Sequence, residues 1–218
     1  MRSAGKNASA FVPEDHSLPN LRVAIQGCRG CDLYRHATQA VLGEIGDAHE
    51  RGQAKVRLLM IGEQPGDRED LEGRPFVGPA GKLLDRCLDE AGIARREVYV
   101  TNAVKHFKWE PRGKIRLHKK PSITEVRACR PWLDAELDAV QPELIVCLGA
   151  VSAQSLLGAK FKVTINHGII REVSGLPPVL ATIHPASILR SRTEEDRHSM
   201  TESFIHDLRQ AAAYLRSR

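Results

Sequence analysis

The sequence has few aromatic residues and no long apolar run. Aromatic residues make up 5% of its 218 residues, and no apolar segment approaches the roughly 18–20 residues that a membrane-spanning helix requires. Residues 1–17 lack the apolar core of a signal peptide, so we expect a cytoplasmic protein that makes no contact with a membrane. Hydrophobic residues still make up 42% of the chain, which favours a globular enzyme over a disordered protein.

Cysteine is also scarce, with five residues. In a cytoplasmic protein this number argues against a disulfide framework and favours metal ligands or buried thiols. Neither sign of charge is absent: 32 Lys and Arg residues stand against 27 Asp and Glu residues, a formal net charge of +5. This excess favours a polyanionic partner.

The length fits one domain. Small and polar residues predominate in 1–18, so we expect a flexible tail there and a single domain over 19–218. Four short apolar runs predict buried strands: Val56–Ile61, Val98–Thr101, Leu144–Leu148 and Val179–Thr182. The helical patterns are Ala80–Ala91, Ser122–Ala139, Ala150–Leu157 and Glu202–Leu215. Strands that alternate with helices predict a parallel sheet with helices on both faces.

Polar residues, glycines and prolines follow each predicted strand. The four segments begin at Gly62, Asn102, Gly149 and Ile183. Right-handed crossovers bring the carboxyl ends of parallel strands to one edge of a sheet. Open α/β sheets bind their ligands at that edge, so we expect the functional site there.

Three cysteines predict a metal centre that lacks one ligand. Cys28 and Cys31 form a CxxC pair before the first predicted strand, and Cys129 lies far downstream. A thioredoxin-like role requires CxxC within a βαβ unit, a context that is absent here. A four-coordinate site needs a fourth ligand, and the spacing fits zinc and an iron–sulfur cluster equally well.

The candidates for the fourth ligand are two cysteines and one histidine. Cys87 occupies an apolar position of a predicted helix, and Cys147 lies within a predicted strand. We expect both to be buried thiols, because free cysteine behaves as a small hydrophobic residue. His106 follows a strand end and is the remaining candidate.

The segment Lys114–Lys120, KIRLHKK, is basic with a histidine at its centre. Lysine and arginine side chains in such a segment contact nucleic-acid phosphates. His118 admits two interpretations: another phosphate-contacting residue, or a nucleophile, since neutral imidazole is reactive near neutral pH. Composition alone favours phosphate contact.

Several motifs together resemble the uracil-DNA glycosylase superfamily, its iron–sulfur branch and, within that, the UdgX group. They are GEQPGDREDLEGRPFVGPAG at 62–81, YVTNAVKHF at 99–107, KIRLH at 114–118, CRPWL at 129–133 and HPASILR at 184–190. The resemblance extends from Cys28 to the C-terminal helix. It implies a three-layer α/β/α sandwich with a central four-stranded parallel sheet, and uracil-containing DNA as the partner. We expect the protein to be a monomer.

The resemblance also implies a pocket for a uracil flipped out of the DNA, as buried bases require. Phe76 resembles the residue that stacks on the base, and Asn102 the amide that pairs with its edge. His184 resembles the donor that stabilises the departing uracil anion. The backbone of Gly62 and Gln64 would add further donors. Without the resemblance, Phe76 would be a core residue, and Asn102 and His184 ordinary loop residues.

Charged and polar residues complete the implied site. Ser187 and Arg190 would contact phosphate, as would Lys114 and Lys119. Glu63, Asp67 and Asp70 are the acidic residues near the first strand end. Asp67 is expected near the uracil, whereas Glu69 and Asp70 fit a solvated acidic run equally well.

In UdgX-like proteins, the histidine of the KRRIH loop attacks the sugar C1′ and leaves a stable protein–DNA adduct. Here Ile115 replaces an arginine and Leu117 an isoleucine, while Arg116 and His118 remain. The resemblance therefore implies that His118 is the nucleophile, with Arg116 in the catalytic group. Glu63 is our candidate for the base that takes the imidazole proton.

For the metal, the resemblance implies a 4Fe–4S cluster on Cys28, Cys31, His106 and Cys129. Two other functions remain open for the chain as a whole. One is a conventional glycosylase that turns over many times, and the other is a non-catalytic, metal-stabilised DNA-binding protein.

Overall fold

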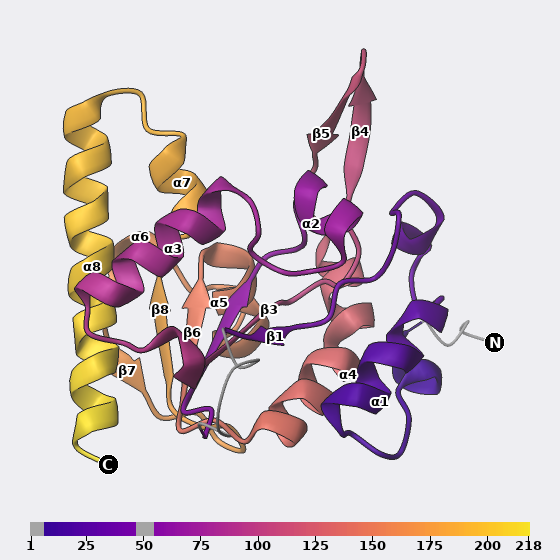
Figure 1. The fold of residues 1–218 in the computed structure, drawn as a ribbon, viewed down its shortest axis with the longest axis horizontal. Helices are drawn as coiled ribbons and strands as arrows, with labels where there is room; N and C mark the ends of the chain where they lie inside the picture. Colours follow the sequence, from indigo (N-terminus) through magenta and orange to yellow (C-terminus); the bar gives the residue numbers. More distant parts are fainter. Residues whose placement is uncertain (1–6, 47–54) are drawn as a thin grey trace.

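A computed structural model describes residues 7–46 and 55–218. Its main sheet has the strand order β1-β3-β2-β6-β8-β7 (Figure 1). The four central strands, all parallel, are β3 (Val98–Asn102), β2 (Leu58–Gly62), β6 (Leu144–Leu148) and β8 (Val179–Thr182). These are the four predicted apolar runs, so the predicted sandwich around a four-stranded parallel sheet is confirmed. Two antiparallel edge strands, β1 (Glu44–Ile45) and β7 (Ile170–Arg171), extend it.

Helices cover both faces of the sheet. One face packs on α3 (Pro79–Glu90), α7 (Pro185–Leu189) and α8 (Glu194–Arg216). The other packs on α4 (Ile123–Val140), α5 (Ala150–Leu157) and α6 (Val163–Asn166). Successive residues of β2 alternate between the two cores: Leu58 and Met60 belong to the first and Leu59 and Ile61 to the second. Each strand is therefore apolar throughout, as strands covered on both faces are.

The C-terminal helix is longer than its pattern predicted. It begins at Glu194 rather than Glu202, and Thr193 caps it by accepting a hydrogen bond from the Asp196 N–H at 3.0 Å. The added turns are largely polar and exposed, so they carry no apolar periodicity. The capping threonine, and not hydrophobic spacing, marks this helix start.

The amino-terminal segment packs on α4 within its described part. Ala8 is buried, and its N–H donates to the Ala128 carbonyl at 2.8 Å. Short 3₁₀ turns at Ser9–Phe11, Ile25–Gly27 and Asp32–Arg35 and helix α1 (Leu18–Ala24) follow. The described part of the predicted tail thus contacts the body through Ala8, Phe11 and Val12, and residues 1–6 lie outside the described part.

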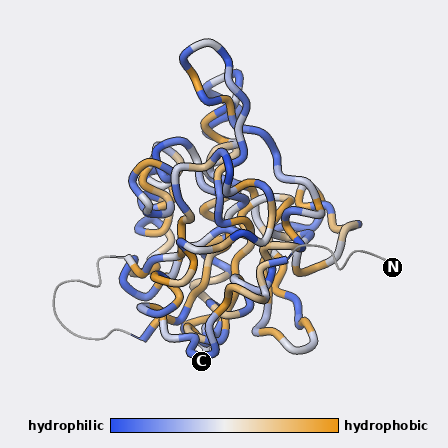
Figure 2. Tube along the Cα trace, turned by 90° about the vertical axis from the view of Figure 1, so that its right-hand side faces the viewer, coloured by the Kyte–Doolittle hydropathy of each residue, from blue (hydrophilic) through white to orange (hydrophobic). Residues whose placement is uncertain are grey.

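The basic segment predicted as a loop forms half of a β-hairpin. Strand β4 (Trp109–Arg112) pairs with β5 (Ile115–His118), and Trp109 lies opposite His118. The hairpin projects from the body at the carboxyl ends of the central strands (Figures 1 and 2). Two short elements, α2 (Asp67–Glu72) and the 3₁₀ turn Arg95–Glu97, complete the described structure. Among these residues, no helix is both long and apolar enough to cross a bilayer.

Candidate functional site

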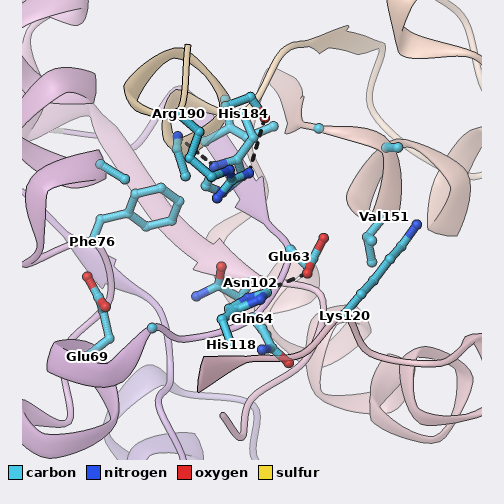
Figure 3. A pocket seen from close by; sticks show the side chains of 17 residues that line it. Glu63, Gln64, Glu69, Phe76, Asn102, His118, Lys120, Val151, His184 and Arg190 are labelled. Atoms are coloured by element: carbon cyan, nitrogen blue, oxygen red, sulfur yellow. Dashed lines mark hydrogen bonds and ion pairs between the residues drawn. The ribbon is translucent and has the colours of Figure 1, made fainter. Parts of the chain in front are cut away.

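A pocket of about 310 Å³ lies at the carboxyl ends of the central strands (Figure 3). Eight predicted site residues line it: Glu63, Gln64, Phe76, Asn102, His118, His184, Ser187 and Arg190. They come from the segments after β2 and β8, from the last residue of β3 and from the hairpin. The predicted convergence at this edge brings together residues up to 127 positions apart in the chain, as Glu63 and Arg190 show.

A glycine permits the close contacts at the pocket floor. Gly62 and Asn102 are directly opposite in the β2–β3 register. A Cβ on Gly62 would lie 2.3 Å from the Asn102 Oδ1 and 2.8 Å from the Phe76 ring. Both distances are too short for a side chain at this position. Residue 62 must therefore be glycine for the Asn102 amide and the Phe76 ring to lie where they do. Gly62 itself is not in the pocket lining.

Phe76 is held in an unusual backbone conformation. Its φ of 56° is in the left-handed region, which costs a bulky residue energy and is found preferentially at functional sites. The following turn fixes it, because the Gly78 N–H donates to Glu69 Oε1 at 2.7 Å. The Phe76 and His184 rings are within 23° of parallel, with centroids 6.0 Å apart. Two flat surfaces therefore border the pocket.

His184 is a neutral hydrogen-bond donor. Burial, together with the nearby Arg190 and His118, lowers its pKa to about 4. Its Nδ1 accepts a hydrogen bond from the Ala186 N–H at 3.1 Å. Because that nitrogen is an acceptor, the proton of the neutral ring is on Nε2. His184 can therefore donate Nε2–H to an oxygen at neutral pH.

His118 and Glu63 face each other across the pocket wall, as Figure 3 shows. His118 Nε2 lies 3.6 Å from Glu63 Oε1, and the side chains are 47% and 25% exposed. Burial lowers the pKa of His118, and Arg190 contributes to this shift. Burial also raises the pKa of Glu63, although Lys120 and Arg190 oppose that effect. The pair thus combines an uncharged imidazole with a carboxylate made more basic than usual.

Arg116 anchors the hairpin to the body instead of lining the pocket. Its guanidinium donates to Asp67 Oδ1 at 2.5 Å and to Asp70 Oδ2 at 2.6 Å. It also stacks over Phe107 and Trp109, 5.4 and 5.6 Å from the ring centroids. Asp67, predicted at the uracil, pairs with Arg116 and is likewise absent from the pocket lining. Asp70 is fully buried, which excludes the alternative that it belongs to a solvated acidic run.

Gln64 braces the base of the hairpin. Its Nε2 donates to the carbonyls of Lys108 and Lys119 at 3.1 and 3.2 Å, and its Oε1 accepts from the Lys108 N–H. The side-chain amide is therefore occupied, although Gln64 borders the pocket. The same segment that follows β2 thus supplies Glu63 to the pocket and fixes the strand that carries His118.

The two lysines predicted to contact DNA are outside the pocket. Lys114 is exposed at the hairpin tip, and Lys119 pairs with Glu110 at 2.8 Å. Lys120, which the sequence analysis did not single out, does line the pocket. Its place in the basic segment was the only available signal, because nothing in KIRLHKK distinguishes the last lysine from the others.

A buried ion pair beneath the site was also missed. Lys105 is fully buried and pairs with the buried Glu136. Its Nζ donates to the Asn102 carbonyl at 2.7 Å and to Thr101 Oγ1 at 2.6 Å. Glu136 also accepts from Tyr99 Oη. This network fixes the end of β3, and a lone lysine in the sequence gave no sign of it.

The predicted metal ligands lie in one region without forming a metal site. Cys28 and Cys129 are buried in the same apolar cluster, with Cys31 packed against it. The Cys129 sulfur accepts from the Lys105 N–H at 3.3 Å, and the Cys28 sulfur from Trp132 Nε1 at 3.2 Å. Within residues 7–46 and 55–218, no three His, Cys, Asp or Glu side chains are arranged to hold a metal ion.

The other cysteines and His106 are buried. Cys87 and Cys147 are fully inaccessible, as predicted, and burial raises the pKa of Cys87 to about 11. His106 is 5% exposed, and burial lowers its pKa to about 4. It directly follows Lys105, whose N–H bonds the Cys129 sulfur.

Comparison with known proteins agrees with this geometry. The model of the uracil DNA glycosylase superfamily matches residues 49–209. The chain is 34% identical over 193 residues to the type-4 uracil-DNA glycosylase of Thermotoga maritima, covering 88% of this chain and 91% of that protein. It is 36% identical over 192 residues to the type-4 enzyme of Archaeoglobus fulgidus, with 84% and 89% covered. A type-5 uracil-DNA glycosylase of Thermus thermophilus is 29% identical over 179 residues, covering 73% and 76%.

Proposed function

This chain belongs to the uracil-DNA glycosylase superfamily, and from that membership we propose that it excises uracil from DNA and then bonds His118 to the abasic sugar. The observation that supports the second part of this proposal, the bond to the sugar, is the position of His118. It lines the same pocket as Asn102 and His184, 3.6 Å from Glu63. A residue that only contacts phosphate has no need of a neighbouring carboxylate inside the base pocket.

The pocket supplies what uracil excision requires. The Asn102 amide offers a donor and an acceptor to the base edge, and Phe76 offers a stacking surface. Cleavage of the bond between C1′ and the uracil nitrogen leaves the electron pair on uracil, whose oxygen becomes negative. The His184 Nε2–H is suited to stabilise that oxygen, because a neutral donor in a buried site needs no reorganisation as charge develops.

The imidazole of His118 then bonds to C1′. A ring nitrogen supplies the electron pair for the new C1′–N bond, which replaces the broken bond to uracil. The imidazole must lose its remaining N–H proton for the product to be neutral. Glu63 is our candidate for the acceptor, because its Oε1 lies 3.6 Å from Nε2 of His118. The N-linked sugar has a poor leaving group, so the adduct is expected to persist and the protein to act once.

The test is denaturing electrophoresis after mixing the protein with uracil-containing oligonucleotides. We expect a heat-stable band of protein joined to DNA, at most one equivalent of uracil released, and no band with thymidine in place of uracil. Catalytic accumulation of free abasic DNA without the band would contradict the adduct. His118→Gly should lose the band and still release uracil if water enters the space.

A conventional glycosylase with multiple turnovers is the second candidate, and Glu63 favours it. A half-buried carboxylate in the pocket can orient a water molecule as readily as it can accept an imidazole proton. The type-4 relatives are themselves named uracil-DNA glycosylases. Product beyond one equivalent under excess substrate would establish this function. Non-catalytic DNA binding is disfavoured, because it does not need Phe76, Asn102 and His184 in one pocket.

We also propose a 4Fe–4S cluster on Cys28, Cys31, His106 and Cys129. The three thiols occupy one region, and N–H donors bond the Cys28 and Cys129 sulfurs as they do around iron–sulfur ligands. The donor set thus fits the cluster in chemistry. When bound, it would join the amino-terminal segment to α4, a structural role. Anaerobically purified protein should contain iron and sulfide; colourless protein with stoichiometric zinc would refute the assignment.

A further inference from the structure

A second cavity, of about 360 Å³, adjoins the uracil pocket. It lies between the first turns of α4 and helix α5, and two residues, Lys120 and Val151, line both cavities. Figure 3 shows these two side chains at the same side of the uracil pocket. None of the predicted site residues lines this second cavity. We call it the α4–α5 groove.

The charge of the α4–α5 groove is of one sign. Lys120, Arg127 and Arg130 line it, and among the described residues its lining includes no acidic side chain. Arg127 is exposed. Arg130 is fixed by Asp134 at 2.6 Å and by the Ser155 carbonyl at 2.9 Å, so its charge is partly neutralised. A cationic wall without carboxylates favours an anionic ligand.

The floor of the groove is apolar. Ile123 is 55% exposed although it is a large hydrophobic side chain, and Val126, Pro121 and Val151 border the same space. Cations beside an apolar surface match the two halves of a nucleotide: phosphate on the charges and the base on the aliphatic side chains. A free inorganic anion would leave the apolar half without a partner.

We propose that the α4–α5 groove binds a nucleotide of the uracil-bearing strand that flanks the flipped uracil. This inference rests on the proposed function. Because Lys120 and Val151 belong to both cavities, a strand with its uracil in the first passes directly over the second. The groove holds a nucleotide of the uracil-bearing strand only. It therefore binds single-stranded DNA or the separated end of a duplex.

The groove has little capacity to read sequence. The Gln154 amide donates to the Phe161 carbonyl at 3.1 Å, and the Ser155 hydroxyl donates to the Ser152 carbonyl at 2.7 Å. These bonds use the Ser155 hydroxyl proton and one N–H of Gln154, and they restrain the two side chains that could otherwise recognise a base edge. The nucleotide is therefore held by phosphate contact and apolar packing, which any base satisfies. Changing its base should alter affinity much less than removing the nucleotide.

The test measures binding separately from cleavage. Fluorescence anisotropy would use single-stranded oligonucleotides with 2′-fluoro-2′-deoxyuridine, whose glycosidic bond resists cleavage. One series ends at the uracil nucleotide, and others add one to three nucleotides on its 5′ or its 3′ side. For the wild-type protein, we expect the first additions on one side to tighten binding by about 3- to 10-fold, with any base.

Two groove variants have matched controls. Arg127→Ala and Ile123→Asp should reduce the affinity gain on that side to about 1-fold. Arg96→Ala removes an exposed cation at the opposite edge of the sheet, and Ile165→Asp places a carboxylate on another exposed isoleucine; both should retain the gain. Arg127→Ala should also reduce the slope of log K against log salt concentration by about 0.7 in magnitude, the value for one phosphate contact on a single strand.

Other outcomes separate the two proposals. No gain on either side, or a gain that Arg127→Ala and Ile123→Asp leave intact, overturns the groove assignment. Uracil release from the matching cleavable oligonucleotide is measured in parallel. If the wild-type protein shows no release and no preference for uracil over thymidine, the proposed function fails, while a groove-dependent gain would still establish the groove as a nucleotide site.

Discussion

The floor of the pocket and the hairpin beside it are supported in different ways. Asn102 lies at the end of a central strand, above the buried Lys105–Glu136 pair. His118 is the last residue of β5, at the base of the projecting hairpin, and three of the four β5 residues are exposed. The floor is fixed by the core, whereas the hairpin depends on a few polar anchors, chiefly Arg116 and Gln64.

This difference separates the two chemical steps that we propose. Uracil recognition and departure involve groups on the core-supported floor, and bond formation involves a group on the anchored arm. Changes beneath the floor should therefore affect folding and both steps together. Changes to the anchors should affect adduct formation more than excision. Four predictions follow from this contrast, in decreasing order of expected effect.

The largest effect is expected beneath the floor. Glu136→Gln removes the charge that compensates the buried Lys105, and an uncompensated buried charge costs about 3–5 kcal/mol. Urea denaturation should show a loss of this size in the free energy of unfolding. Glu195→Gln, on an exposed carboxylate of α8, should change it by less than about 0.5 kcal/mol. Equal stabilities of the two variants would show that the pair does not support the floor.

The next effect concerns the departing base. His184→Ala removes the Nε2–H donor, and loss of one such donor costs about 10²- to 10³-fold in rate. Single-turnover release of uracil should fall by this factor, and adduct formation with it, since the adduct follows excision. His198→Ala, which removes an exposed histidine of α8, is the control. Normal release by His184→Ala would exclude this role.

An intermediate effect should come from the hairpin anchor. Arg116→Ala breaks the contacts to Asp67 and Asp70 and frees His118 to move, and a displacement of about 1 Å can cost up to about 10²-fold in rate. Adduct formation should fall about 10- to 100-fold, and uracil release by less than about 3-fold.

Two further variants make the anchor test specific. Arg116→Lys should rescue adduct formation only partly, because an ammonium cannot reproduce the fork that reaches two carboxylates. Arg112→Ala, on the opposite face of the same hairpin, should resemble the wild type. Equal losses of release and adduct formation in Arg116→Ala would show that the hairpin is not a separate unit.

The smallest effect is expected for the pH dependence of adduct formation. The pKa of His118 is lowered from 6.5 by burial and by Arg190, so the neutral, nucleophilic form persists below the usual imidazole range. Adduct formation should be highest near pH 8 and fall as the pH drops, with a midpoint below 6.5. His184, with a pKa of about 4, stays neutral throughout this range. A midpoint above 6.5 would contradict the lowered pKa.

The residues of the floor were predictable because their positions follow from local patterns. Asn102 and Gly62 end apolar runs, and the parallel arrangement of those runs places both at one edge. The hairpin residues were not predictable in the same way. Arg116 and His118 share one hairpin face only once the segment is a strand. Ile115–His118 does alternate apolar and polar residues, but Ile115 and Leu117 are exposed in the hairpin and do not pack in the core.

The sequence by itself determined the four-stranded parallel sheet, the edge at which the site forms and eight of the 17 residues that line the pocket. It did so because strands covered on both faces are apolar along their whole length, and the polar segments after them meet at one edge. Only the tertiary structure decided that Arg116 and Asp67 are an anchor, that Gln64 is a brace and that Lys120 borders two cavities. The contacts of Arg116 and Gln64 join residues 44–55 positions apart, and local sequence patterns carry no information about which distant polar groups will pair.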